Sequence, residues 1–139
     1  MDPAAARERF ASSRVARLAT VDDQGRPHVV PLVFAVDRET IYFAIDLKPK
    51  RTADLKRVRN IAANPNVSLL ADHYDDDDWT ALWWARADGT ARVVETRGDA
   101  DRAMALLAAR YPQYRDQPPP GPVVAITVDR WSGWSFKSS

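Results

Sequence analysis

The chain has 139 residues, the size of one ordinary domain, so residues 1–139 are expected to form a single domain with no room for a second. Apolar residues make up 45% and charged residues 28%, a composition that is typical of globular proteins and excludes a disordered chain. The net charge is only +1, with 20 basic and 19 acidic residues, which argues against a nucleic-acid-binding protein.

Cysteine is absent and there are only two histidines. Disulfides, thiol nucleophiles and cysteine-based metal sites are therefore excluded, and two histidines are too few for most zinc sites built without cysteine, so we expect no metal. The sequence has no apolar run long enough for a transmembrane helix, so we expect no membrane span. The N-terminal segment MDPAAARERF contains arginines and no apolar stretch, so we expect no secretory signal and a cytoplasmic protein.

The N-terminal third of the chain predicts a helix followed by a strand. Asp2 is a suitable N-cap and Pro3 a suitable first helical residue, so a short helix is expected over the first dozen residues. Apolar residues at consecutive positions over 28–36 predict a strand that is buried on both faces or bends through a closed barrel. Pro31 lies within this strand and has no N–H, which indicates an edge strand or a bulge.

The rest of the chain completes a mainly β pattern. We expect strands over 41–45, 67–73, 123–128 and 131–135, and two helices, one that Thr52 caps and Asn64-Pro65 ends and one over about 99–111. We also expect a solvated loop at 75–78 and an extended connector at 117–122. Between Leu82 and Glu95, Asp88-Gly89 could form a hairpin turn, but one long strand with a bulge at Gly89 is preferred because the hairpin arm would be very short. Six or seven strands with two or three short helices outside them predict a small antiparallel β-barrel.

Six of the 20 basic residues fall within the twelve positions from Lys48 to Arg59. The segment Lys48-Pro49-Lys50-Arg51-Thr52 lies between a strand and a helix start, where backbone N–H groups, the helix dipole and a threonine hydroxyl favour an anion. The lysine charges and the arginine fork add to this, so the segment predicts a phosphate site. The spacing alone fits a solvated basic surface equally well, and Lys56, Arg57 and Arg59 are expected to be surface residues.

All five tryptophans follow residue 78. Trp83 and Trp84 are adjacent and point to opposite faces of a sheet, so one of them needs a second surface, which a subunit interface or a planar ligand would provide. A tryptophan-rich core is the alternative for any single ring, but five together favour a dimer. No serine has the histidine and aspartate companions of a hydrolase, and no catalytic residue is assigned; Tyr42, His73 and Tyr74 are candidate proton donors.

Three segments, LATVDDQGRPHVVP, KRTADL and NPNVSLL, resemble the pyridoxamine 5'-phosphate oxidase-like family of split β-barrel proteins that bind FMN or coenzyme F420. The later segments HYDDDDWTALWWARADGTARV, ARYPQYRDQPPPGPV and RWSGWS resemble one branch of this family, the probable F420-dependent enzymes of actinobacteria. The resemblance, which covers nearly the whole chain, implies a mainly β fold, a split antiparallel barrel of the FMN-binding type with flanking helices. It also implies a homodimer with two sites at its interface.

The resemblance further implies which residues bind the cofactor. The isoalloxazine-like ring is expected along the second and third strands, near Pro31, Leu32, Val33, Ala44, Ile45 and Asp46. The cofactor phosphate is expected at Lys50, Arg51 and Thr52, within the segment that the residue pattern predicts as an anion site. The partner subunit is expected to contribute aromatic walls, with Trp79, Trp83 and Trp131 as candidates.

The cofactor that the resemblance implies is the deazaflavin coenzyme F420, with FMN as the alternative. The chain lacks the long Arg/Lys-rich strand with which the phosphate oxidases hold FMN, and it is shorter than they are at the C-terminus. A protein of this kind is expected to be an oxidoreductase that moves a hydride between the deazaflavin and a small conjugated or quinone-like substrate in an apolar cleft at the dimer interface. The alternative is a protein of the same fold that binds F420, FMN or haem without turnover.

Overall fold

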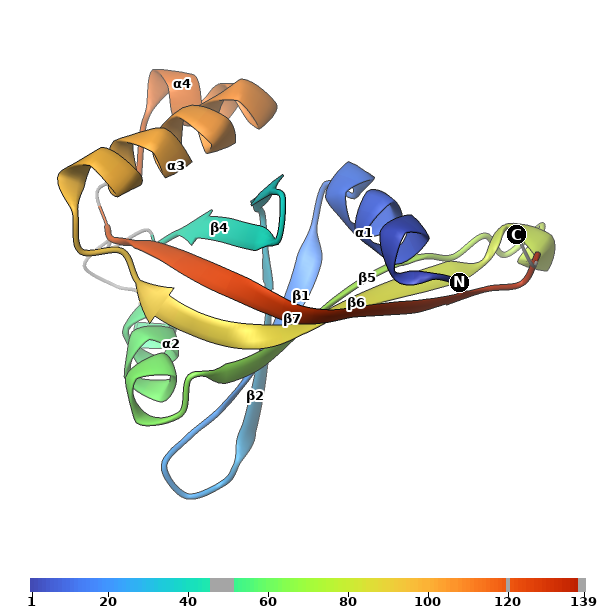
Figure 1. Cartoon of the computed structure of the whole chain (residues 1–139), viewed down its shortest axis with the longest axis horizontal. Coiled ribbons are helices and arrows are strands. Elements are labelled where there is room, and N and C mark those ends of the chain that lie inside the picture. Colours follow the sequence, from blue (N-terminus) through green and yellow to red (C-terminus); the bar gives the residue numbers. More distant parts are fainter. Residues whose placement is uncertain (46–51, 120, 138–139) are drawn as a thin grey trace.

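Seven strands form a single antiparallel sheet in the computed structural model, which describes residues 1–45, 52–119 and 121–137, with the backbone alone for residues 52–55 (Figure 1). The strands are β1 (Ala16–Val21), β2 (Pro27–Leu32), β3 (Ala35–Asp37), β4 (Thr40–Ala44), β5 (Asn66–His73), β6 (Trp83–Val93) and β7 (Val123–Ser135). The helices are α1 (Pro3–Ser12), α2 (Thr52–Ala63), α3 (Arg97–Arg110) and α4 (Pro112–Asp116), with the short 3₁₀ helix η1 (Trp79–Ala81). The prediction of a mainly β, split antiparallel barrel is confirmed.

The strand order β2-β1-β5-β6-β7-β4-β3 leaves the barrel with one open seam. β2 and β3 lie at opposite ends of this order, although only Val33 and Phe34 separate them in the chain. No backbone ladder between the described residues joins these two edges, so the chain itself bridges the seam. The strand predicted over 28–36 is therefore two strands, and Pro31 lies in the edge strand β2, as its missing N–H predicts.

Three aromatic rings hold α1 against the barrel. Phe10 of α1 is fully buried, and its ring centroid lies 4.8 Å from that of Phe34 and 5.5 Å from that of Trp131. The helix begins where the sequence predicts, because the Asp2 carboxylate accepts the Ala5 N–H at 2.8 Å. This packing places α1 across β6 and β7 on the inner side of the sheet's long strands (Figure 1).

Strands β6 and β7 are 11 and 13 residues long and pair along their whole lengths. Figure 1 shows β5, β6 and β7 running past α1 as an arm whose tip carries η1 and the C-terminal residues. The prediction of one long strand with a bulge at Gly89 is confirmed, because the register shifts between Asp88 and Gly89. The prediction of two segments over 123–128 and 131–135 is wrong: β7 is continuous, and Asp129 is the residue left unpaired at the shift.

Helix α4 raises the number of α-helices in the described residues to four, where two or three are predicted. It follows α3 directly and begins with Pro112 at its first position, so the extended connector starts only after it. No helix in the described part of the chain is long and apolar enough to cross a membrane.

Gly89→Ala is expected to lower the free energy of unfolding by about 1–3 kcal/mol. A Cβ at Gly89 would lie 2.1 Å from the carbonyl oxygen of Thr127, so the backbone of β7 would have to move. Gly98→Ala in α3 is the matched control, because a Cβ there meets nothing within 4 Å. Alanine is the better helix former, so the control should be unchanged or stabilised by up to about 1 kcal/mol. Urea unfolding followed by circular dichroism measures both, and equal stabilities would contradict the close approach at the bulge.

Candidate functional site

The ends of β2 and β4 meet beside the seam. Val33, which follows β2, and Ala44, the last residue of β4, both pack against one cluster formed by Ala35, Leu107 and Tyr111. Both side chains are only half-buried, and Pro31 on β2 is exposed. The structure therefore brings together two of the residues predicted to lie along the cofactor ring and leaves part of their surface open.

Leu32 and Ile45 belong to the same predicted set, but their side chains point into the barrel. They are 8% and 0% exposed and form part of the main core. The Ile45 N–H donates to the carbonyl of Pro122 at 2.9 Å, which ties the end of β4 to the start of β7. These two residues therefore position the strand ends, and only their backbone remains for a ligand.

Two side chains at the end of α3 form hydrogen bonds with the backbone N–H and C=O groups at the seam. The Tyr111 hydroxyl lies 3.0 Å from the carbonyl oxygens of Phe34 and Arg14, which share its one proton, and it accepts the Phe34 N–H at 3.2 Å. Arg110 donates to the Phe34 carbonyl at 3.0 Å and to the carbonyl of Ser13. Burial lowers the pKa of Arg110 from its ordinary value, but an arginine remains charged at neutral pH.

The basic segment is placed only in part. Asp46, Lys50 and Arg51 lie outside the described residues, and Thr52 is described only as the first residue of α2. Arg57, which the sequence predicts at the surface, is half-buried, with its guanidinium carbon 5.9 Å from the ring centroid of Phe43. Arg57 of α2 therefore places a positive charge against β4. This is a tertiary contact, which the sequence pattern of the helix does not predict.

The three predicted aromatic walls do not lie together. Trp131 is 7% exposed in the core, and its indole N–H donates to a Glu39 carboxylate oxygen at 2.7 Å, so it has little surface to offer a second subunit. Trp79 is 60% exposed on η1, and Trp83 is half-buried at the start of β6. These two lie at the tip of the arm. Trp84 turns to the other face of β6, where the guanidinium carbon of Arg86 lies 5.7 Å from its ring centroid.

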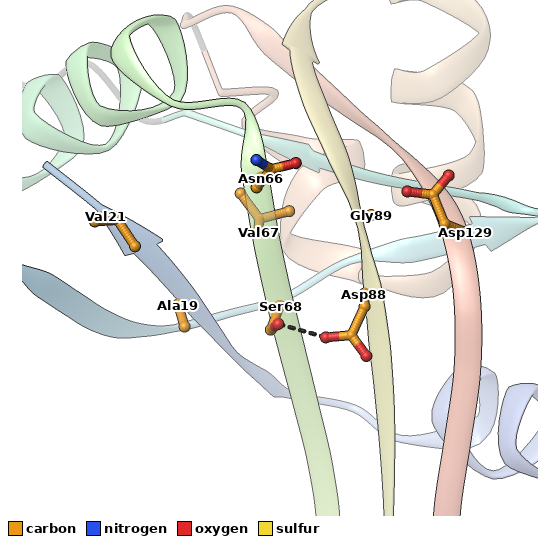
Figure 2. Close-up of a pocket in the computed structure, with 8 residues that line it drawn as sticks. All are labelled: Ala19, Val21, Asn66, Val67, Ser68, Asp88, Gly89 and Asp129. Atoms are coloured by element: carbon orange, nitrogen blue, oxygen red, sulfur yellow. Dashed lines mark hydrogen bonds between the residues drawn. The ribbon is translucent and has the colours of Figure 1, made fainter. Parts of the chain in front are cut away.

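The outer face of the sheet carries two hollows beside one another. The first, shown in Figure 2, has a volume of about 380 Å³ and is lined by residues of β1, β5 and β6 together with Asp129. Ser68 donates to one carboxylate oxygen of Asp88 at 2.5 Å, and Arg86 donates to the other at 3.1 Å. Both oxygens of Asp88 are therefore bonded within the chain. No group of three metal-ligating side chains is found among the described residues.

The second hollow is mostly apolar and shares Ser68 with the first. Its rim carries Val29 and Leu70, which are 61% and 40% exposed. Arg17 lies between them and is 3.8 Å from a carboxylate oxygen of Asp72. The face therefore combines exposed apolar side chains with charges of both signs.

Comparison with known proteins places this fold in a family. The sequence profile described as Pyridoxamine 5'-phosphate oxidase matches residues 2–135. A relative of known activity, the 5a,11a-dehydrotetracycline/5a,11a-dehydrooxytetracycline reductase of Streptomyces rimosus subsp. rimosus, is 32% identical over 82 residues. Those residues make up 59% of this chain and 56% of the reductase, so the chain matches little more than half of that relative's length.

Two solved structures share the architecture. A FAD-binding protein from Mesorhizobium loti superposes with a TM-score of 0.74 at 21% identity, covering 96% of this chain and 94% of its own. The haem storage protein from Vibrio cholerae superposes with a TM-score of 0.70 at 22% identity, covering 97% and 95%. At these identities the likeness shows the fold alone.

Tyr111→Phe is expected to lower the free energy of unfolding by about 1–3 kcal/mol, because the seam backbone at Phe34 loses a buried partner. Tyr42→Phe is the matched control, since the Tyr42 hydroxyl has no hydrogen-bond partner within the described residues and its loss should change stability little. Urea unfolding measures the difference. Two variants of equal stability would show that Tyr111 does not hold the seam.

Proposed function

The chain belongs to the pyridoxamine 5'-phosphate oxidase family, and on that premise we propose that it is an oxidoreductase that uses the deazaflavin coenzyme F420. The observation that carries the proposal is the meeting of the two strand ends beside the seam. Val33 and Ala44 present half-buried apolar surface there, and the chain runs from Ala44 through Ile45 directly into the basic segment. A planar ring with a phosphate attached needs this combination of apolar strip and nearby cations.

The residues of the chain would divide the binding work. Val33, Ala44 and Pro31 would contact the ring and exclude water from it, while Lys50, Arg51 and Thr52 would bind the phosphate. Arg57, packed on Phe43, adds positive charge to the same end of β4. The bound deazaflavin supplies the hydride chemistry, and the protein supplies position and electrostatics. FMN, which has the same ring-and-phosphate plan, is the alternative cofactor.

A second copy of the chain would complete the site. The apolar outer face with Val29 and Leu70 is the surface that we assign to the dimer, because it carries exposed apolar side chains beside the Arg17–Asp72 ion pair. A twofold interface must be self-complementary, and a face that carries apolar side chains and charges of both signs meets this requirement. Trp79 and Trp83 remain the candidates for aromatic groups offered to the partner's site.

The name of the family relative supports the substrate class that we propose. The Streptomyces rimosus protein is named as a reductase of a dehydro compound, one with an additional carbon–carbon double bond. We therefore propose that this chain reduces a small, electron-poor conjugated double bond or a quinone-like compound in the interface cleft. An apolar cleft suits such a substrate, because it can hold a flat conjugated body against the ring and exclude water from the hydride transfer.

Binding without turnover is the second candidate. Of the described residues at the two strand ends, Pro31 through Val33 and Ala44 through Ile45, none carries a titratable proton. Tyr42 packs in a different cluster, against Val123 and Ala125, and a fold neighbour stores haem. A panel of enones, quinones and nitro compounds offered to the bound, reduced deazaflavin distinguishes the two functions. Accelerated oxidation of the cofactor supports the enzyme, and no acceleration by any compound supports the carrier.

Arg51→Ala is expected to weaken deazaflavin binding by about 10- to 150-fold, corresponding to the loss of one charge-assisted contact of about 1.5–3 kcal/mol. Fluorescence titration of the wild-type protein with the deazaflavin, and in parallel with FMN, measures the affinities. Arg97→Ala is the control, because Arg97 is exposed at the start of α3 and its loss should leave both affinities unchanged. No micromolar binding of either cofactor to the wild-type chain would overturn the proposed function.

Leu70→Asp is expected to convert a dimer into a monomer, since a charge would be buried in the apolar part of the interface. Light scattering coupled to size exclusion measures the mass. Gln113→Asp, an exposed position on α4, should keep the wild-type mass. If Leu70→Asp stays dimeric, the second subunit docks on another face; if the wild-type chain is monomeric, the interface site fails.

A further inference from the structure

We propose that the hollow between α1 and the tip of the arm binds a small aromatic carboxylate. The hollow has a volume of about 380 Å³ and is formed where α1, the end of β5, η1 and the ends of β6 and β7 meet. This volume is at the lower end of the ~300–1,000 Å³ range of small-molecule pockets, which fits a single ring with a short substituent.

Two cations face this hollow from different elements. Arg9 comes from α1 and Lys137 follows β7. Within the described part of the chain, neither has a carboxylate oxygen within 4.0 Å. Their charges are therefore available to an anion. The Thr80 and Ser135 hydroxyls beside them already donate, to an Asp78 carboxylate oxygen and to the Lys137 carbonyl, so the two cations are the donors offered to a ligand.

The loop beside the hollow is acidic. The hydrogen bond from the Thr80 hydroxyl, with a smaller contribution from the Lys137 charge, lowers the pKa of Asp78 below its usual value, so this carboxylate is ionised at neutral pH. Asp75, Asp76 and Asp77 precede it in the same loop. These negative charges repel a phosphate dianion more strongly than a singly charged carboxylate, so the carboxylate is the anion that we propose.

An aromatic wall orients the arginine. The guanidinium carbon of Arg9 lies 5.4 Å from the ring centroid of Trp83, and the His73 ring lies 6.4 Å from the same ring at an interplanar angle of 20°. A guanidinium held on an indole face keeps its N–H fork free for a carboxylate. Trp83 is itself packed against the main core, and Leu82 adds apolar lining, so the wall is rigid and suits a flat apolar body.

The hollow is far from the strand ends in the same chain. Ala44 pairs with Val123 at the beginning of β7, and the hollow lies beside Ser135 at its end. A strand rises about 3.3 Å per residue, so these two points are about 40 Å apart along β7. The hollow is therefore separate from the strand ends of its own chain; Trp83, which is also a candidate for the partner's cofactor site, is the residue that the two proposals share.

The first test compares benzoate with benzamide, which has the same shape and no charge. Benzoate is expected to shift the indole N–H resonance of Trp83 in a proton–nitrogen NMR spectrum, with a dissociation constant that rises with salt. Benzamide is expected to bind at least 10-fold more weakly. Equal binding of the two compounds, or no shift of Trp83 with millimolar benzoate, would overturn the proposal.

Variants locate the binding. Arg9→Gln and Lys137→Gln should each weaken benzoate binding at least 10-fold, because both side chains are exposed cations whose loss leaves the fold intact. Arg115→Gln, an exposed arginine on α4, should bind benzoate like the wild type. Wild-type benzoate affinity in both hollow variants would refute the site. So would a loss of deazaflavin affinity in Arg9→Gln with benzoate binding unchanged, since the hollow would then belong to the cofactor site.

Discussion

The barrel depends on the hydrogen bonds made by the short backbone segment, Val33 and Phe34, that connects its two unpaired edge strands. β2 and β3 are neighbours in the chain and lie at opposite ends of the sheet, so Phe34 between them has no strand partner. A buried peptide group without a partner costs about 1–3 kcal/mol. Tyr111 and Arg110 remove this cost by bonding the N–H and C=O of Phe34 from the end of α3.

This arrangement couples α3 to the ends of β2 and β4. The helix supplies Leu107 as well as Tyr111 to the cluster on which Val33 and Ala44 pack, so the polar and apolar contacts position the same two strand ends. A fully paired barrel would have used these edges for a ladder and covered them with neighbouring strands. The open seam instead leaves part of the apolar surface of Val33 and Ala44 exposed, and this is the surface that the proposed flat ligand would contact.

The parts of the fold that the sequence predicted are those with local causes. The Asp2 cap depends on residues three positions apart and is found. Gly89 marked the register shift in the sequence, although the residue left unpaired there, Asp129, lies on β7. The break after Leu32 was missed because its cause is the fully buried Phe34 ring, which packs against Phe10 on a distant helix. The half-buried position of Arg57 likewise depends on its contact with Phe43 of β4. The sequence pattern of the helix alone does not predict this contact.

The candidate site shows the same division between local and tertiary causes. Successive residues of a strand point to opposite faces, so Val33 and Leu32 face different sides, as do Ala44 and Ile45. This alternation alone could have separated the half-buried members of the predicted set from the core members. The net charge of +1 conceals a different feature, the separation of the cations into groups. The binding of a polyanion depends on the net charge of a large surface, whereas a single phosphate or carboxylate interacts mainly with the charges within a Debye length of about 8–10 Å. The near-zero net charge is therefore compatible with both proposed anion sites, because each depends on a few neighbouring cations and not on the total charge of the chain.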